Sequence, residues 1–311
     1  MKVLHITNLY PTVKHSTYGI FVKEQIKSLE DKNLQNYYFI NAKEFGIKAY
    51  FKAFVDLYYL TKKYDILHCH HQFSVLPVIF SKKKKILSVL GDLSKRSLSN
   101  RIIYYLVKQR CIIIIFKNTI PIINSKYYLL PNGVNTEVFI PIEITKARKI
   151  LNLDQSKIYV LFVCNGNLDN PIKRKDKFDR VLEELNKNGI IYEELILSNV
   201  ERDKIVYYYN SANLMLVTSE HEGSPNAVKE AMACNLPIVS TPVGDVYRNL
   251  KNVTNSFVTK SFEIGELVES IKRVDPFKKS NSRNKIFSMK LDLSTKTKEL
   301  TKLYSNLFSK S

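Results

Sequence analysis

Two glutamates flank a segment that has the features of a helix start. Glu222 and Glu230 have seven residues between them, including the consecutive pair Ser224 and Pro225. Serine is favoured at a helix N-cap and proline at the first helical position, so we expect a helix from Pro225 to about Cys234. The free backbone N–H groups at such a start form an anion site that suits a diphosphate. Because a carboxylate only accepts hydrogen bonds, the two glutamates could bind hydroxyls at both ends of a sugar nucleotide.

The chain around this segment alternates short β-branched runs with helical patterns, which is typical of parallel sheets covered by helices. We expect strands at 3–6, 37–40, 66–70, 86–90, 112–115, 158–163, 195–198, 214–218 and 237–240. The expected helices include residues 21–30, 181–185, 204–210, 225–234 and 291–308. The sequence therefore predicts an α/β fold of two doubly wound domains with a cleft between them.

The length of 311 residues suits two hydrophobic cores better than one. A turn at 131–134 separates the two sets of elements, so we place an N-terminal domain at 1–136 and a C-terminal domain at 137–290. The helix in 291–311 is expected to pack back toward the N-terminal domain.

Basic residues are concentrated in the first of these domains. Residues 1–135 contain 21 Lys and Arg against 7 Asp and Glu, which is +14 of the net charge of +19. This excess favours an acidic partner or surface. The run Lys82–Lys85, with the basic residues of 101–110, could contact anionic lipid, although a solvated loop and a compositional bias toward Lys, Asn, Ile and Tyr are alternatives. Nucleic acid is not expected as a partner, since the aromatic residues mostly occupy apolar periodic positions.

Targeting and redox signals point to the cell interior. Asn8 and Pro11 interrupt the N-terminus too early for a signal peptide, and the longest apolar run, 111–116, is far too short for a membrane span. The four cysteines, at positions 69, 111, 164 and 234, show no paired spacing and are expected to be small core residues in a reducing compartment. We expect a cytoplasmic protein that could associate with the inner face of the plasma membrane.

The segment from Glu222 to Glu230, continued by the apolar stretch 231–241, resembles the E-x7-E signature of group 1 (family 4) retaining glycosyltransferases. Residues 130–139 are similar to the PNGVD stretch between the domains of that family, and 1–10 with Gly19 resemble its first strand and loop. The resemblance covers nearly the whole chain and implies the GT-B fold, in which two Rossmann-like domains face each other across a cleft.

The resemblance also implies roles for individual residues. Glu222 would hold hydroxyls of the donor sugar and Glu230 the nucleotide ribose, while the backbone N–H groups of 224–227 would face sugar and phosphate. Lys173 matches the lysine that neutralises the departing diphosphate, which makes Glu222 and Lys173 the candidate catalytic residues. The candidate donor-binding residues are Gly19, Asn167, Lys173, Arg174, Glu222, Gly223, Ser224, Pro225, Asn226, Ala227 and Glu230.

Three positions depart from the family pattern or leave it open. Asn167 stands where the family usually has an arginine, and Arg174 could partly compensate, with a solvated surface charge as its alternative. Leu90 replaces a histidine often found before the Gly91–Asp92 pair. Gly19 would let the backbone approach the donor phosphate, although a turn glycine is the alternative.

Histidines end one strand of the N-terminal domain. In the run 68–71, alternation along a strand places His68 and His70 on one face. His70 and Asp92 are the candidate contacts to the acceptor; a buried, hydrogen-bonded histidine and a metal ligand are the alternatives for the former.

The resemblance thus implies a retaining glycosyltransferase that moves a hexose-type sugar from a nucleotide diphosphate, with a UDP-sugar favoured over a GDP-sugar. The acceptor would be a hydroxyl of a glycan or a lipid-linked glycan in surface polysaccharide or glycolipid synthesis. No cofactor or metal is expected. The alternatives are an epimerase or phosphorylase of the same fold, and a non-catalytic protein that binds nucleotide or nucleic acid through the basic N-terminal half.

Overall fold

The computed structural model describes residues 1–15, 17–29, 35–90, 97–119, 125–164, 168–187, 189 and 191–309. The chain divides into two compact units. The N-terminal unit comprises Met1–Lys14, Tyr18–Gly133 and Leu293–Ser311, and the C-terminal unit comprises His15–Thr17 and Val134–Asp292. These divisions fall close to the boundaries expected at 136 and 290, and the last helix is grouped with the N-terminal unit.

The N-terminal unit contains a parallel sheet in the order β2-β1-β3-β4-β5-β6. Its strands are β1 (Val3–Thr7), β2 (Gln35–Phe39), β3 (Ile66–His70), β4 (Lys84–Val89), β5 (Ile113–Phe116) and β6 (Tyr127–Leu129). The side chains of β1, β3 and β5 are buried throughout, which is why these strands read as continuous apolar runs. The strand order reverses between β1 and β3.

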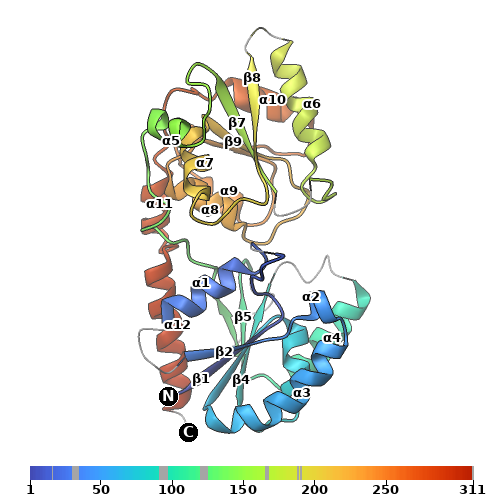
Figure 1. The fold of residues 1–311 in the computed structure, drawn as a ribbon. Coiled ribbons are helices and arrows are strands. Elements are labelled where there is room, and N and C mark those ends of the chain that lie inside the picture. Colours follow the sequence, from blue (N-terminus) through green and yellow to red (C-terminus); the bar gives the residue numbers. More distant parts are fainter. Residues whose placement is uncertain are drawn as a thin grey trace. The chain divides into compact units, whose positions relative to one another are not determined.

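Two layers of helices cover this sheet. On one face lie α1 (Ile20–Leu29) and α12 (Leu293–Phe308), which share a core with Val3, Ile66 and Ile86. On the other face lie α3 (Lys48–Leu60), the 3-10 segment η3 (Gln72–Val78) and α4 (Leu98–Lys108), which pack on Leu4 and Leu67. Figure 1 shows the two layers on either side of the sheet. The short elements α2 (Ala42–Phe45) and η2 (Thr61–Lys63) flank α3.

The C-terminal unit repeats this plan with a five-stranded parallel sheet in the order β11-β10-β9-β7-β8. The strands are β7 (Ile158–Val163), β8 (Tyr192–Leu197), β9 (Leu214–Val217), β10 (Ile238–Ser240) and β11 (Phe257–Val258). One face is covered by α6 (Lys175–Asn186) and α10 (Ile264–Lys272). The other is covered by α7 (Ile205–Ser211), α8 (Asn226–Ala233), α9 (Val246–Leu250) and α11 (Ser282–Ser288), with α5 (Ile144–Ile150) against α7.

The predicted fold class, two parallel-sheet α/β domains, is therefore confirmed. The predicted core role of the cysteines is confirmed as well, since all four are free and buried. Among the described helices, none has the length and apolar character that crossing a membrane requires. The sequence analysis left residues 41–65 without an element, and the structure places α2, α3 and η2 there.

Candidate functional site

The candidate site of the C-terminal unit lies where the strand order reverses, at the carboxyl ends of β7 and β9. In open parallel sheets this is where loops from neighbouring strands diverge and ligands bind. The loop that leads to α6 carries Lys173 and Arg174, and the loop after β9 carries residues 218–225. A backbone hydrogen bond of 2.9 Å from the Glu220 N–H to the Ile172 carbonyl joins the two loops.

Lys173 and Glu222 form the central ion pair of this site. The Lys173 Nζ atom lies 2.6 Å from Glu222 Oε1, and both side chains are about four-fifths buried, with 23% and 18% of their surface exposed. Ser219 Oγ also donates to Glu222 Oε1 at 3.1 Å. The carboxylate is thus oriented by two donors, while it stays close enough to the surface to reach a ligand. The structure brings together the two residues that the sequence analysis named as catalytic.

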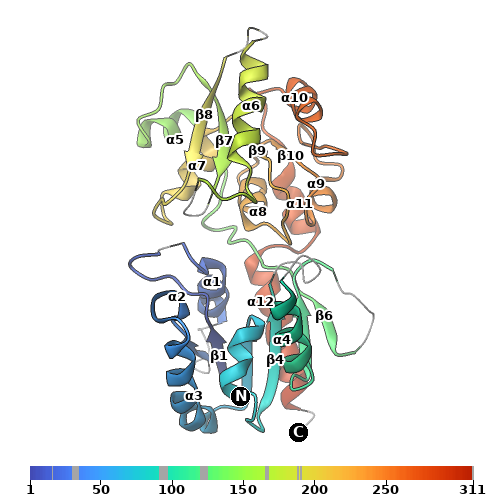
Figure 2. The same cartoon turned by 90° about the vertical axis from the view of Figure 1, so that its right-hand side faces the viewer.

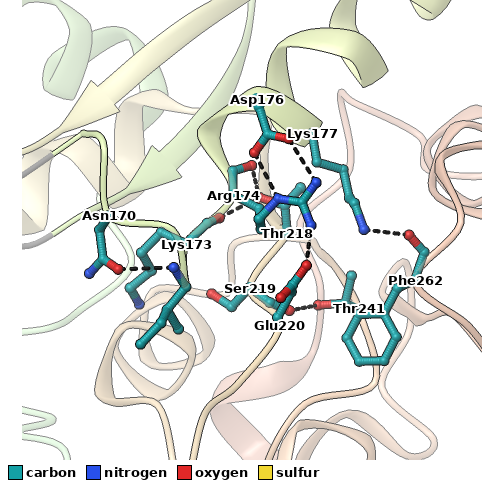
Figure 3. A network of polar contacts seen from close by, with 11 residues as sticks. Asn170, Lys173, Arg174, Asp176, Lys177, Thr218, Ser219, Glu220, Thr241 and Phe262 are labelled. Atoms are coloured by element: carbon teal, nitrogen blue, oxygen red, sulfur yellow. Dashed lines mark hydrogen bonds and ion pairs between the residues drawn. The ribbon is translucent and has the colours of Figure 1, made fainter.

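Arg174 forms ion pairs with carboxylates other than Glu222. It lies in the left-handed region at φ 55° and caps α6, and its guanidinium donates to both oxygens of Asp176 at 2.8 and 2.7 Å and to Glu220. The hydrogen bonds to Asp176 raise the pKa of Arg174, so its charge is permanent. Thr218 Oγ1 donates to the carbonyls of Lys173 and Arg174 at 2.8 and 3.0 Å. Figure 3 shows this network, which fixes the backbone beside Lys173.

The start of α8 differs from the sequence-based expectation. The helix begins at Asn226 and Pro225 is its N-cap, so Ser224 is not the cap and Pro225 is not the first helical residue. The reason is a competing partner, because Ser224 Oγ donates to Asp245 Oδ2 at 2.7 Å. The side chain of Pro225 has no acceptor, so the N-cap residue itself makes no capping hydrogen bond to the first turn of α8.

A buried network holds the loop before α8 in place. Lys229 is 1% exposed and donates from Nζ to Ser224 Oγ at 2.9 Å, so Ser224 links this ammonium to the buried carboxylate of Asp245. Asp245 in turn donates its N–H to the Gly223 carbonyl at 3.1 Å. A Cβ at Gly244 would lie 2.3 Å from that carbonyl oxygen, so only glycine permits this approach. The loop that carries Glu222 is therefore braced from the segment after β10.

Glu230 lies on α8, inside the core of the unit, and is 8% exposed. Tyr209 donates its hydroxyl to Glu230 Oε2 at 2.8 Å, and Arg202 Nη2 lies 2.8 Å from Oε1. Burial, followed by the charge of Glu230, raises the pKa of Tyr209, so the phenol remains a donor. The guanidinium of Arg202 stacks 4.7 Å from the ring centre of Phe139. These contacts fix the carboxylate in one orientation.

Together these features form one polar site at the end of the sheet. Lys173, Glu222, Pro225 and Ala227 line a single small hollow with residues of β7 and β9. The ammonium of Lys173 and the N-terminal end of the α8 dipole favour an anion there, and the carboxylate of Glu222 accepts hydroxyl donors. The chemistry is that of a ligand which carries both phosphate and hydroxyl groups.

Several predicted site residues belong to the N-terminal unit or fall outside the described part of the chain. Asn167 and Asp92 fall outside the described residues. Gly19 belongs to the N-terminal unit and has φ 70°, and a Cβ there would lie 2.3 Å from the carbonyl carbon of Leu9. The close approach of two backbone segments therefore requires glycine at this position, which supports the turn alternative.

His70 is buried at the carboxyl end of β3. Its Nε2 atom lies 3.0 Å from His5 Nδ1, and burial, with the charges of His5 and Lys117, holds its pKa well below the usual range. The ring nitrogens of His5, His68 and His70 lie within 4.8 Å of one another. Both nitrogens of His68 are already hydrogen-bonded, however, to Tyr304 at 2.5 Å and Ser88 at 2.8 Å. This arrangement matches the buried, hydrogen-bonded alternative rather than a metal site.

The sequence analysis missed the residues that position the two glutamates. Arg202, Tyr209 and Asp245 belong to other loops and helices, and no spacing within the motif points to them. Ser219 lies in the loop of Glu222, three residues before it. Lys229 lies inside the motif, and a lysine on the buried side of a short helix is the one signal that could have revealed it.

One known protein family matches part of the chain. Residues 144–274, within the C-terminal unit, match the family described as "Glycosyl transferases group 1". The resemblance to that family is thereby confirmed for this part of the chain. A search of curated proteins by sequence finds no match.

Solved structures resemble the chain over nearly its whole length. Sucrose-phosphate synthase from Thermosynechococcus elongatus is 16% identical, with all of both chains covered and a TM-score of 0.76. HepE from Anabaena in complex with UDP-glucose is 15% identical, with 98% of this chain and 100% of that chain covered and a TM-score of 0.76. The catalytic domain of starch synthase IV from Arabidopsis thaliana, bound to ADP and acarbose, is 12% identical, with 98% and 99% covered and a TM-score of 0.71. The fold is that of GT-B glycosyltransferases.

Proposed function

Because residues 144–274 match group 1 glycosyltransferases, we propose that the protein transfers a sugar from a nucleotide diphosphate donor bound by its C-terminal unit. The observation that carries this proposal is the 2.6 Å pair of Lys173 and Glu222 beside the start of α8. Glu230, held by Tyr209 and Arg202, supplies a second fixed carboxylate on the same helix.

Each group has a distinct task in the proposed donor complex. The N–H groups at the start of α8 and the ammonium of Lys173 bind the diphosphate, Glu222 accepts hydroxyls of the donor sugar, and Glu230 accepts those of the ribose. The ammonium of Lys173 stands at the end of a flexible side chain, so it can move from Glu222 to the phosphate when the donor enters.

The reaction proceeds with retention of the anomeric configuration. As the glycosidic bond breaks, negative charge develops on the leaving diphosphate, where Lys173 and the helix dipole stabilise it. The acceptor hydroxyl attacks from the side that the diphosphate leaves and gives its proton to a phosphate oxygen. Glu222 orients the sugar and forms no covalent bond to it, and neither a metal ion nor a cofactor takes part.

The donor is a UDP-sugar of hexose type, and the acceptor is a hydroxyl of a glycan or lipid-linked glycan used in surface polysaccharide or glycolipid synthesis. The complexes of HepE with UDP-glucose support this choice of donor. The protein works in the cytoplasm, with the acceptor offered at the inner face of the membrane.

A screen of UDP-, GDP- and ADP-sugars that detects the released nucleoside diphosphate tests this proposal. We expect release from a UDP-sugar, unchanged by a metal chelator, and an anomeric NMR signal of the product that shows retention. Glu222→Gln, in a folded protein, should lower the release at least tenfold. Folded wild-type protein that releases nothing from any donor, or that converts a donor only into its epimer, would contradict the proposal.

A further inference from the structure

Helix α3 of the N-terminal unit is apolar on two opposite sides. Its inner side packs on the sheet through Ala53 and Leu57, which are fully buried. Its outer side carries Phe51, Val55 and Tyr58, which are 69%, 61% and 62% exposed. A surface helix normally has one apolar stripe and a polar outer face. The outer side of α3 is therefore an apolar surface that no described residue of the chain covers.

Neighbouring residues enlarge this surface. Phe80, just after η3, is 75% exposed, and with Phe54 and Tyr58 it lines an open hollow of about 500 Å³. Together they form what we call the α3 face, whose exposed apolar members are Phe45, Ile47, Phe51, Phe54, Val55, Tyr58, Tyr59 and Phe80. Contiguous exposed apolar surface of this kind marks an interaction site.

The lysines around the α3 face define its electrostatic character. They are Lys48, Lys52, Lys62, Lys63, Lys82 and Lys83, and none forms an ion pair with a described residue. Lys62 lies over the ring of Tyr58 at 4.9 Å. The acidic residues of α2 and α3 are Glu44 and Asp56, and Asp56 already accepts a hydrogen bond from Tyr38 at 2.5 Å. The face is thus both aromatic and basic.

The opposite helix layer of the same sheet shows that this is not a general bias of composition. On α12 the exposed side chains from Ser294 to Asn306 are serine, lysine and asparagine, and Phe308, at the end of the helix, is its one large exposed apolar residue among those described. The outer surface of α3 is thus rich in aromatic residues and that of α12 is polar, although both helices belong to one unit. The aromatic residues of α3 need an explanation of their own.

We propose that the α3 face docks on an anionic lipid bilayer. Aromatic rings suit the boundary between head groups and acyl chains, while lysines reach the anionic head groups with their aliphatic stems against apolar surface. A protein partner or a second copy of the chain could cover the aromatic residues, but it would leave the positive charge of the six lysines without a counter-charge. An anionic bilayer matches both properties at once.

Helix α4 extends the same surface. Both α3 and α4 pack on η3, and Figure 2 looks toward this layer, with η3 in cyan between them. Leu98, Ile102 and Leu106 of α4 are 70%, 50% and 62% exposed, and Lys108 lies 4.1 Å from the ring centre of Tyr105. The basic residues near 101–110 therefore belong to this layer, as the sequence suggested.

For the second basic segment expected to contact lipid, the run Lys82–Lys85, the structure corrects the expectation. The run Lys82–Lys85 does not act as one basic patch, because the side chains of Lys84 and Lys85 turn into the unit. Lys84 Nζ donates to the Leu307 carbonyl at 2.6 Å, and Lys85 is 4% exposed and donates to the Ser81 carbonyl. Only Lys82 and Lys83 remain for a lipid surface, together with the lysines of α3 and η2.

Co-sedimentation of the full chain with vesicles tests the proposal. The vesicles contain either phosphatidylcholine alone or phosphatidylcholine with about 30% phosphatidylglycerol, which is anionic. Binding to each is measured at low and at high salt. We expect binding to the anionic vesicles only, weakened at least tenfold by high salt. Phe51→Ser/Phe80→Ser should lower binding at least tenfold, and Lys62→Gln/Lys82→Gln at least threefold. All four side chains are outside the core, so folding should be unaffected.

The matched control is Lys298→Gln/Lys302→Gln, which removes two exposed lysines from α12 and should leave binding unchanged. No binding to anionic vesicles at low salt, equal binding to neutral vesicles, or an equal loss in the α12 control would overturn the proposal. So would a dimer of the free chain that Phe51→Ser/Phe80→Ser dissociates, because a second copy would then occupy the face. The release of nucleoside diphosphate in solution is measured separately, so docking and the proposed function can fail independently.

Discussion

In the candidate site of the C-terminal unit charged side chains meet partners of opposite sign, whereas around α3 of the N-terminal unit six lysines stand among exposed aromatic rings. Lys173 pairs with Glu222, Arg174 with Glu220 and Asp176, and Arg202 with Glu230. Paired charges in a partly buried site fix the geometry of side chains, which a ligand site needs. Unpaired charges on an outer surface fix nothing within the chain, and they are available to an external partner. We therefore propose that the two units serve different kinds of recognition.

The largest effect is expected from removing the charge at the centre of the C-terminal site. Glu222→Gln keeps the size of the side chain but removes the partner of Lys173 and the acceptor of the sugar hydroxyls. Turnover should fall at least tenfold, which corresponds to about 1.4 kcal/mol of transition-state stabilisation. Steady-state kinetics measures this, with Glu193→Gln, at the exposed pair with Lys157, as the control. A folded Glu222→Gln protein with normal turnover would remove Glu222 from the site.

Acid should destabilise the N-terminal unit selectively. Burial holds the pKa values of His68 and His70 well below the usual range, so both are neutral in the folded unit and take up protons on unfolding below about pH 6.5. The unfolded state then binds more protons, so stability is constant above that pH and falls as the pH drops. The loss is up to about 1.4 kcal/mol per pH unit for each histidine.

Hydrogen exchange followed by mass spectrometry can resolve this effect by unit. Peptides from β1 and β3 should lose protection between pH 6.5 and 5, after correction for the intrinsic exchange rate, while peptides from β7 and β9 keep it. Equal acid sensitivity in both units would mean that the buried histidines do not determine it.

A smaller effect is expected at Lys173. In Lys173→Ala the charge that develops on the leaving diphosphate loses one counter-charge, so kcat should fall about fivefold, or about 1 kcal/mol, more than donor affinity falls. Lys157→Ala, which removes an exposed lysine of the same unit, is the control. Weaker donor binding with unchanged kcat would make Lys173 a docking charge only.

The smallest effect concerns the support of Glu230. Tyr209→Phe removes one hydrogen bond to a carboxylate that Arg202 still holds. Donor KM should rise about threefold, or about 0.6 kcal/mol, with kcat nearly unchanged. Tyr247→Phe, at an exposed tyrosine of α9, is the control. A fall in kcat without a change in KM would place Tyr209 in the chemical step instead.

The sequence sufficed for the fold class because buried parallel strands such as Ile66–His70 and Ile158–Val163 are continuous apolar runs with clear ends. It did not suffice for α3, whose apolar residues lie on both sides and so hide the helical period. Helix α3, which the sequence analysis missed, is thus the helix with the unusual surface.

The candidate site, too, could be predicted only in part. The spacing of Glu222 and Glu230 is local, so it could be read from the chain. Tyr209 and Asp245 come from other loops, and only the folded sheet brings them together. The capping role expected for Ser224 was wrong because a distant carboxylate, that of Asp245, competes for its hydroxyl.

The central claim is that the C-terminal unit holds the nucleotide. Hydrogen exchange of the full chain with and without saturating UDP tests it most directly, because it locates the bound nucleotide by unit without relying on turnover. We expect added protection in peptides that cover residues 170–178 and 218–230, and much less of it in Glu222→Gln/Glu230→Gln. Protection confined to the N-terminal unit, or none at any UDP concentration, would contradict the account.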